Sequence, residues 1–336
     1  MCKGFKGKKL FGERFSEHTT FKTGGVIPLY VEPVDEDDLK LILEFFHQQN
    51  IPSFILGGGS NIVPDDDGID FAVISTGSLC GITVREEGAD SLADSSTDRA
   101  TDRRDSAKKE CGANNTETLL LTCGAGTPIE KITEFCIENS LSGLESFAGL
   151  PGTAGGAAYM NARCYGVSIS DVLDSVRYAK CSPEDSDCVS FAEYTKKDED
   201  WDYKKSPFQN TPDVILSVTF RVRKGDRGEI RSKSESFVED RRCKGHFRYP
   251  SAGSVFKNNR EFGKPSGQII QDAGLRGLSE GGAQVAPWHG NIIVNTGNAT
   301  SADIKRLSDK VVSEVKKKFG FELENEILFV DRGIVR

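Results

Sequence analysis

The sequence predicts an α+β protein of two or three domains, and three observations carry that prediction. Its 336 residues exceed the roughly 100–200 residues of a single domain. Near the amino end, short apolar segments alternate with one helical segment, as in small α/β units. Residues 171–222 alternate as antiparallel strands do, and an amphipathic helix lies near the carboxyl end.

The first predicted domain covers residues 1–78. In TTFKTGGVIPLYVE at 19–32 a strand follows a turn, and residues 37–50 have the apolar period of a helix. IPSFIL at 51–56 and FAVIST at 71–76 are predicted to be two further strands. The buried face of the helix is predicted from four apolar residues: Leu39, Ile42, Leu43 and Phe46. This order of elements predicts a small α/β unit.

A second domain is predicted over residues 79–223. LLLTCGAG at 119–126 is a strand that enters a glycine turn, and residues 128–139 form a helix with Pro128 near its first turn. Residues 86–117 hold almost no large apolar side chains and mix acidic, basic and hydroxyl residues. Such a segment cannot bury enough apolar area to offset its ordering entropy. We therefore expect a mobile surface insertion without a chemical role.

The third predicted domain covers residues 224–324. A helix within the charged stretch 224–247 leads into it, and a clear amphipathic helix spans 301–319. FELENEILFV at 321–330 is predicted to be the last strand. We assign residues 325–336 to a separate carboxyl-terminal strand.

Charge and hydropathy narrow the class of protein. The formal net charge is -8, which argues against general affinity for nucleic acid or anionic lipid. No apolar run approaches the roughly 20 residues of a membrane span, and no apolar segment follows the basic start as in a secretory signal. We therefore expect a cytoplasmic monomer that binds neither nucleic acid nor membrane.

The nine cysteines and four histidines do not form a metal-binding pattern. No cysteine belongs to a CxxC pair, and the histidines at 18, 47, 246 and 289 lack zinc-ligand spacing. Reduced thiols are the simpler interpretation. We expect neither a metal site nor a disulfide.

The glycines cluster in three loops, and each loop follows an apolar segment. GGGSN stands at 57–61, CGAGT at 123–127 and GLPGTAGGA at 149–157. Glycines let the backbone approach a ligand closely, and successive amides can point at one anion. The first loop alone is as easily explained by a tight turn. Three such loops favour a long ligand with a pyrophosphate and a flat ring, and FAD is such a ligand.

Ten segments of the chain occur in the order of one known family. They are TTFKTGG, ILGGGSN, GAGTPIEKI, LSGLESFAGLPGTAGGAAYMNARCYG, DYKKSPF, YPSAGSVFKN, AGLRG, GGAQVAPWHGNIIVN, ATSADI and LENEI. From about residue 18 to 330, the chain resembles the UDP-N-acetylenolpyruvoylglucosamine reductases, with only the polar insertion unaccounted for. The resemblance implies a vanillyl-alcohol-oxidase-type FAD-binding fold of two α/β subdomains, followed by an α/β substrate-binding domain.

The same resemblance implies the reaction. Reduction of UDP-N-acetylglucosamine enolpyruvate to UDP-N-acetylmuramate would use FAD and NADPH and would supply a peptidoglycan precursor. NADPH gives hydride to the flavin and leaves, and the substrate then binds in the same place. Hydride reaches the terminal carbon of the double bond, so a proton must reach the neighbouring carbon and charge on the carboxylate must be stabilised.

Three residues match the catalytic positions of the family. Ser254 in SAGSVFKN corresponds to its proton donor, and Glu326 in LENEI to its carboxyl-terminal glutamate. Lys204 in DYKKS stands where the family usually has arginine, and it keeps the charge without the bidentate fork. Asn325 replaces the usual proline before Glu326. We hypothesise that Arg163, in MNARCYG, supplies part of the missing cationic geometry.

Binding residues are predicted from the glycine loops and from the motifs. Those for FAD are Leu56, Gly57, Gly58, Gly59, Ser60, Asn61, Gly124, Gly126, Pro151, Gly152, Thr153, Gly155, Gly156 and Asn161. Those for the UDP-sugar are Tyr165, Arg242, Lys257 and Asn258, with Lys244 as a further candidate. The basic residues among them are equally compatible with a solvated surface.

Two other functions fit parts of the pattern. An FAD oxidase of the same fold would act on an alcohol or a sugar and would usually tether its flavin to histidine or cysteine. Neither His18 nor Cys164 lies in a motif that indicates tethering. A degenerate homologue that only binds FAD or a UDP-sugar is supported by Lys204 alone.

Overall fold

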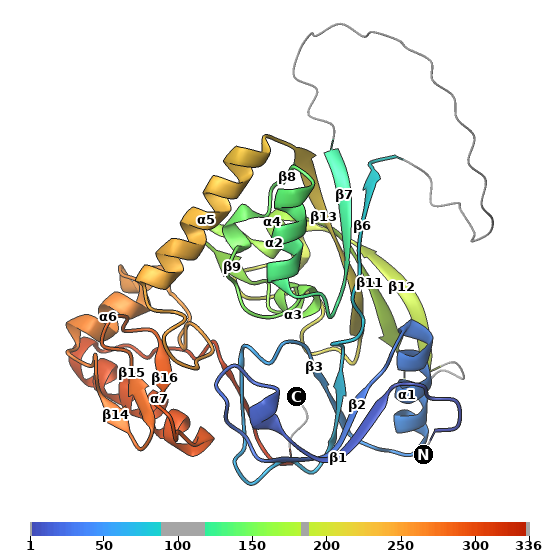
Figure 1. Ribbon diagram of the computed structural model, residues 1–336. Helices are drawn as coiled ribbons and strands as arrows, with labels where there is room; N and C mark the ends of the chain where they lie inside the picture. Colours follow the sequence, from blue (N-terminus) through green and yellow to red (C-terminus); the bar gives the residue numbers. More distant parts are fainter. Residues whose placement is uncertain (1, 89–117, 183–187, 334–336) are drawn as a thin grey trace, which may run out of the picture.

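The computed structural model describes residues 2–88, 118–182 and 188–333 (Figure 1). Most of the predicted insertion 86–117 therefore lies outside the described residues. An amino-terminal sheet with one helix, an antiparallel sheet with several helices, and a carboxyl-terminal unit follow one another along the chain. No helix among the described residues is long and apolar enough to cross a membrane.

The amino-terminal unit is a four-stranded sheet with one covering helix. Its strands run in the order β1 (Lys8–Arg14), β2 (Val26–Glu32), β5 (Ala72–Ser75) and β3 (Ser53–Leu56). β1 is antiparallel to β2, and β2, β5 and β3 are parallel. The short 3₁₀ helix η1 (Phe15–Glu17) follows β1.

The helix α1 (Glu36–Gln48) confirms the predicted helix and its buried face. The Asp35 carboxylate accepts a hydrogen bond from the Asp38 amide at 2.8 Å, which satisfies one free amide of the first turn. The four predicted apolar residues are all buried against this unit and against the neighbouring sheet. The predicted strand at 19–32 is confirmed only over β2, because residues 19–25 form the turn before it.

The second sheet is antiparallel throughout. Its strands run in the order β12 (Val189–Thr195), β11 (Leu173–Cys181), β13 (Val214–Lys224), β7 (Thr118–Gly124) and β6 (Ile82–Glu86). The short β8 (Leu141–Ser142) pairs with the end of β13. This sheet confirms the antiparallel pattern predicted over 171–222.

Helices cover one face of this sheet (Figure 1). They are α2 (Ile129–Glu138), η2 (Glu145–Phe147), α3 (Ala154–Tyr159) and α4 (Ile169–Val172). Their apolar side chains form one core with β7, β11 and β13. The hairpin β9 (Arg163–Cys164) and β10 (Val167–Ser168) and the 3₁₀ helix η3 (Asp198–Asp200) complete this part.

The helix α5 (Arg227–Cys243) packs on α2 and η2 and leads into the carboxyl-terminal unit. This unit contains η4 (Arg260–Phe262), α6 (Ser266–Asp272), α7 (Ser301–Phe319) and a sheet of β14 (Ser279–Glu280), β15 (Ala283–Val285) and β16 (Ile293–Asn295). The bounds of α7 are those predicted from the sequence. Its side chains Ile304, Leu307, Val311 and Val315 are fully buried in the core of the unit.

The end of the chain returns to the amino-terminal unit. β17 (Leu328–Val330) pairs in parallel with β4 (Ile62–Pro64), which directly follows the first glycine loop. The predicted strand at 321–330 is therefore too long. Asn325 forms an isolated β-bridge with Phe256, and the Glu326 amide donates to the Val255 carbonyl at 2.7 Å. The segment directly before β17 is therefore hydrogen-bonded to the carboxyl-terminal unit and is not part of the strand.

Candidate active site

A cavity of about 1330 Å³ is lined by residues from all parts of the chain. Two of the three predicted glycine loops form one side, which we call the glycine wall and define as residues 57–61 and 151–156. The loop 57–61 joins β3 to β4, and residues 151–156 comprise the turn before α3 and the first residues of that helix. The glycine wall thus lies where the amino-terminal unit meets the second sheet.

At Gly58 and Gly59, the glycine wall leaves no room for a side chain. A Cβ atom at Gly58 would lie 2.7 Å from the Gly152 Cα, and one at Gly59 only 1.9 Å from the His18 carbonyl oxygen. Gly152 also has a φ of +108°, which other residues rarely adopt. The Ser60 hydroxyl donates to the Pro151 carbonyl at 3.3 Å and joins the two loops.

The third predicted loop contributes less to the cavity. Ala125 lines it, but Gly124 and Gly126 do not. A Cβ at Gly124 would lie 2.3 Å from the Leu79 carbonyl oxygen, and one at Gly126 would lie 2.1 Å from that of Thr76. These two glycines therefore allow close packing of chain on chain behind the cavity.

Leu56 and Thr153 line the cavity, and Thr153 also caps α3 by accepting a hydrogen bond from the Gly156 amide at 3.4 Å. Asn161 does not line it. Its side chain is buried, accepts from the Ser170 amide at 3.0 Å and donates to the Asp202 carbonyl at 2.9 Å. Asn161 thereby fixes the segment that carries Lys204.

Lys204 and Glu326 meet in the cavity although 122 positions separate them (326 − 204). The Lys204 Nζ lies 2.5 Å from the Glu326 Oε1, and the two side chains are only 10% and 12% exposed. Lys204 has a left-handed φ of 59°, and its carbonyl accepts from the Gln209 side chain at 3.1 Å. The unusual backbone at Lys204 points its ammonium group at the glutamate.

Ser254 lines the same cavity, and the segment that contains it is hydrogen-bonded to Glu326. The Glu326 amide donates to the carbonyl of Val255, the next residue after Ser254, and Asn61 Nδ2 donates to the Glu326 carbonyl at 3.0 Å. The structure therefore brings Lys204, Glu326 and Ser254, the three predicted catalytic residues, to one cavity beside the glycine wall.

Another part of the cavity lining carries aromatic and basic side chains. We call it the cationic wall and define it as Tyr165, Arg241, Lys244, His246 and His289, all of which line the cavity. Both basic groups lie over the Tyr165 ring, with the Arg241 guanidinium carbon at 5.2 Å and the Lys244 Nζ at 5.5 Å from its centre. The Tyr165 hydroxyl donates to Asp240 at 2.8 Å, and burial together with this carboxylate raises the pKa of Tyr165 to about 12.

The two histidines of the cationic wall were not predicted, because neither stands at a recognisable spacing. Their ring centres lie 5.8 Å apart. Burial is the main cause that lowers the pKa of His246 to about 4, and the charge of Arg241 adds to it. Burial and then Arg276 also lower the pKa of His289. Both rings are therefore neutral at pH 7.

Several predicted binding residues contact other groups. Arg242 does not line the cavity and pairs with Glu239 on the exposed side of α5. Lys257 does not line it either and pairs with Glu324. Asn258 lines the cavity, accepts from the Ser266 amide at 2.8 Å and donates its own amide to the Tyr203 hydroxyl at 3.2 Å.

Arg163 lines the cavity but does not contact Glu326. Its guanidinium donates to the Ser168 hydroxyl at 3.1 Å. The hypothesis that Arg163 replaces part of the usual arginine geometry remains a prediction. Within the described ranges, no group of three or more His, Cys, Asp or Glu residues could hold a metal ion.

Comparison with known proteins decides the family. Residues 245–330 match the model of the UDP-N-acetylenolpyruvoylglucosamine reductase C-terminal domain. The chain is similar to the UDP-N-acetylenolpyruvoylglucosamine reductase of Treponema denticola, with 45% identity over 93% of this chain and 90% of the relative. The chain belongs to the UDP-N-acetylenolpyruvoylglucosamine reductase family. The Borreliella burgdorferi reductase is 39% identical over 95% of this chain and 93% of its own.

A solved member of this reductase family has the same fold. The crystal structure of the reductase from Thermus caldophilus matches 97% of this chain and 99% of its own with a TM-score of 0.69, at 24% identity. The predicted fold class is thus confirmed. The chain is a flavoprotein oxidoreductase of peptidoglycan precursor synthesis, which decides against an alcohol oxidase and against a binding module without activity.

Proposed function

We propose that this protein uses FAD and NADPH to reduce UDP-N-acetylglucosamine enolpyruvate to UDP-N-acetylmuramate. The observation that carries the proposal is the Lys204–Glu326 pair, which shares a cavity with Ser254 beside the glycine wall. A proton donor and a cation at one place are what reduction of an enolpyruvyl ether requires.

The residues present fit FAD in three respects. The Thr20 hydroxyl lines the cavity, is buried and has no hydrogen-bond partner among the described residues, so a ligand could satisfy it. The glycine wall offers close backbone approach for a pyrophosphate. Beyond it, apolar side chains such as Phe46, Phe54 and Val214 line the cavity and suit a flat ring.

Bound FAD would supply the hydride chemistry, taking hydride from NADPH and passing it to the terminal carbon of the enolpyruvyl double bond. Ser254 would donate its hydroxyl proton to the neighbouring carbon and regain one from solvent. Lys204 would stabilise the charge that develops on the substrate carboxylate, and it already holds the Glu326 carboxylate in place. Glu326 would orient the reacting group.

The cationic wall would bind the diphosphate of the UDP-sugar. Arg241 and Lys244 supply charge there, and the Tyr165 hydroxyl supplies a donor. Of the substrate-binding residues predicted from the sequence, Tyr165 and Asn258 line the cavity and are retained in this proposal. Arg242 and Lys257 do not line the cavity, and their role in substrate binding stays a prediction. We further propose that the enzyme acts as a monomer, which light scattering on the purified protein would test.

One experiment tests the proposed function. The purified protein should show flavin absorbance and should oxidise NADPH only when UDP-N-acetylglucosamine enolpyruvate is present. UDP-N-acetylmuramate should appear in equal amount to the NADPH consumed. A colourless protein, or NADPH oxidation that is indifferent to this substrate, would contradict the proposal.

A further inference from the structure

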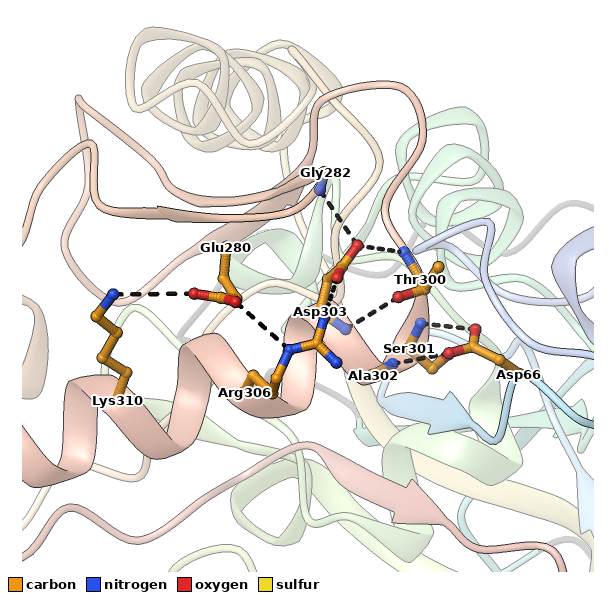
Figure 2. A network of polar contacts seen from close by, with 9 residues as sticks. All are labelled: Asp66, Glu280, Gly282, Thr300, Ser301, Ala302, Asp303, Arg306 and Lys310. Atoms are coloured by element: carbon orange, nitrogen blue, oxygen red, sulfur yellow. Dashed lines mark hydrogen bonds and ion pairs between the residues drawn. The ribbon is translucent and has the colours of Figure 1, made fainter.

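The segment after the first glycine loop contacts both the end of the chain and the carboxyl-terminal unit. β4 pairs with β17, and the Asp65 amide donates to the Val330 carbonyl at 2.9 Å. Asp66 reaches further. Its Oδ1 accepts from the Ser301 amide at 2.7 Å, and its Oδ2 accepts from the Ala302 amide at 2.8 Å, at the start of α7 (Figure 2).

These two bonds complete the capping of α7. The Thr300 hydroxyl accepts from the Asp303 amide at 3.0 Å, and the Asp303 carboxylate accepts from the Thr300 amide at 3.0 Å (Figure 2). The capping box thus serves the third amide of the helix, and Asp66 serves the first two. A charged acceptor at a helix amino terminus is favourable because it satisfies free amides and the helix dipole. Unlike the capping box, Asp66 comes from another part of the protein.

The loop that carries Asp66 is fixed on the amino-terminal unit. The Gly25 amide donates to the Asp65 carbonyl at 2.8 Å, and a Cβ at Gly25 would lie 2.2 Å from the Asp66 carbonyl oxygen. On the other side, a Cβ at Gly68 would lie 2.4 Å from the Val26 carbonyl oxygen. The backbone of this loop therefore packs closely against the backbone of the amino-terminal unit, and the Asp66 carboxylate is held in a fixed position.

The helix α7 in turn supports two of the proposed catalytic residues. The fully buried Ser308 hydroxyl contacts the Asn325 side-chain oxygen at 2.8 Å, directly before Glu326. The apolar face of α7 shares one core with Val255 and Phe256, which follow Ser254. A shift of α7 would therefore move Ser254 and the segment before Glu326 relative to the glycine wall, to which the Glu326 carbonyl is also bonded by Asn61 Nδ2.

We propose that Asp66 is a positioning residue of the reaction. It holds α7, and through it Ser254 and Glu326, at a fixed place relative to the glycine wall. This inference rests on the proposed function, since it assigns Ser254 to the step in which the substrate is reduced. The transfer of hydride from NADPH does not use Ser254 and depends less on this placement.

The test separates the two half-reactions by stopped-flow absorbance of the flavin. In Asp66→Ala, we expect reoxidation of reduced flavin by the substrate to slow by about tenfold, because small misplacement of a proton donor is costly. Flavin content and the rate of reduction by NADPH should stay within about twofold of the wild type. Asp66→Asn keeps one acceptor oxygen and should lose only about threefold in the same step.

Two matched controls exclude simpler explanations. Asp67→Ala removes the same charge from the same loop, and no partner of the Asp67 side chain is found in the described part of the chain. Thr300→Ala weakens the same helix end from within its own unit. We expect Asp67→Ala to match the wild type and Thr300→Ala to lower the melting temperature without slowing reoxidation selectively.

The outcomes are distinguishable. If the wild type does not react with the substrate, the proposed function fails. If the wild type reacts but Asp66→Ala slows neither half-reaction, slows both equally, or is matched by Thr300→Ala, the positioning role is wrong. Should Asp66→Ala fail to fold, the same comparison with Asp66→Asn decides.

Discussion

The two walls of the cavity are built differently. The glycine wall presents backbone: a Cβ at Gly58 would clash with the Gly152 Cα at 2.7 Å, and one at Gly152 with the Ser60 Oγ at 2.7 Å. The cationic wall presents side chains, and a neighbour holds each of its two basic ones: Arg241 Nε donates to the Ala148 carbonyl at 3.1 Å, and Lys244 pairs with Asp240 at 2.6 Å. Substitutions in the glycine wall should therefore act through steric overlap, whereas substitutions in the cationic wall should act through charge and should depend on pH.

The largest effect is expected at Ser254, which lines the same cavity as the two walls. Ser254→Ala removes the proposed proton donor, and general acids contribute about 10²–10⁴-fold to rate. We expect substrate-dependent flavin reoxidation to fall by about that factor while NADPH still reduces the flavin. Stopped-flow absorbance measures both rates. Ser251→Ala, in the same loop, is the control, and an equal loss there would mean that the loop rather than the hydroxyl matters.

The second largest loss of activity is expected from substitution of Lys204. Lys204→Met leaves the Glu326 carboxylate almost buried and without its cation, and breaking a buried pair costs about 3–5 kcal/mol. Loss of the cation should also lower kcat/KM for the substrate by about 10²-fold. Urea unfolding and steady-state kinetics measure the two effects.

Lys204→Arg restores the cation and should recover most of the activity, although the guanidinium fork has a different shape. Lys205→Met is the matched control, because the Lys205 side chain is 68% exposed and its Nζ lies as far as 3.9 Å from the Asp202 carboxylate. Equal losses in Lys204→Met and Lys205→Met would contradict a special role for the buried pair. Arg163→Gly in the Lys204→Arg background tests the compensation hypothesis, which predicts a smaller loss there than in the wild type.

Elements with a local signal were predictable from the sequence. The bounds of α7 follow from its apolar period, its capping box and Gly320 in the left-handed conformation, all within one segment. By contrast, β1 was missed because its pattern is mostly exposed, with Phe11 at 66%. The pairing of β4 with β17 joins residues such as Ile62 and Leu328, and no local pattern indicates a contact so distant in sequence.

The same distinction, between features with a local sequence signal and contacts between distant residues, applies to the candidate site. Glycine clusters predicted the glycine wall, but sequence alone could not separate glycines that face the cavity from Gly124 and Gly126, which face other chain segments. Family motifs placed Ser254 and Glu326, whereas His246 lies in none of the ten segments and is recognised only by its position in the cavity. His289 and Thr20 lie within two of these segments, but only the structure shows that they line the cavity.

A third prediction contrasts two glycines of the glycine wall. Gly58→Ala should destabilise the protein by about 1–3 kcal/mol, because the new methyl group overlaps Gly152. Gly156→Ala should raise stability by about 0.5–1 kcal/mol, because Gly156 lies within α3 and its Cβ would make only an ordinary contact at 3.5 Å with Thr153 Oγ1. Thermal unfolding of the flavin-free protein measures both, and a change of the same sign in the two variants would contradict the packing argument.

The smallest effect is expected in the cationic wall and depends on pH. The pKa of His246 is lowered from 6.5 to about 4 in the folded protein, mainly by burial. Between these values the unfolded chain binds a proton that the folded chain does not, so this contribution to stability is complete above pH 6.5 and is lost as pH falls towards 4. His289, Arg241 and Lys244 face His246 and oppose its protonation, whereas Asp240 favours it.

Replacement of this histidine should make the pH dependence of stability shallower. From pH 7 to pH 5, the wild type should lose roughly 1 kcal/mol more of its free energy of unfolding than His246→Gln, a value reduced for the partial exposure of the ring. Urea unfolding at the two pH values measures it, with His47→Gln, an exposed histidine of α1, as the control. Parallel losses in the wild type and His246→Gln would show that the cationic wall does not hold this ring neutral. A shallower dependence of the free energy of unfolding on pH, seen only in His246→Gln, would show that the cationic wall responds to pH. The glycine wall has no titrating side chain and should not contribute to this dependence.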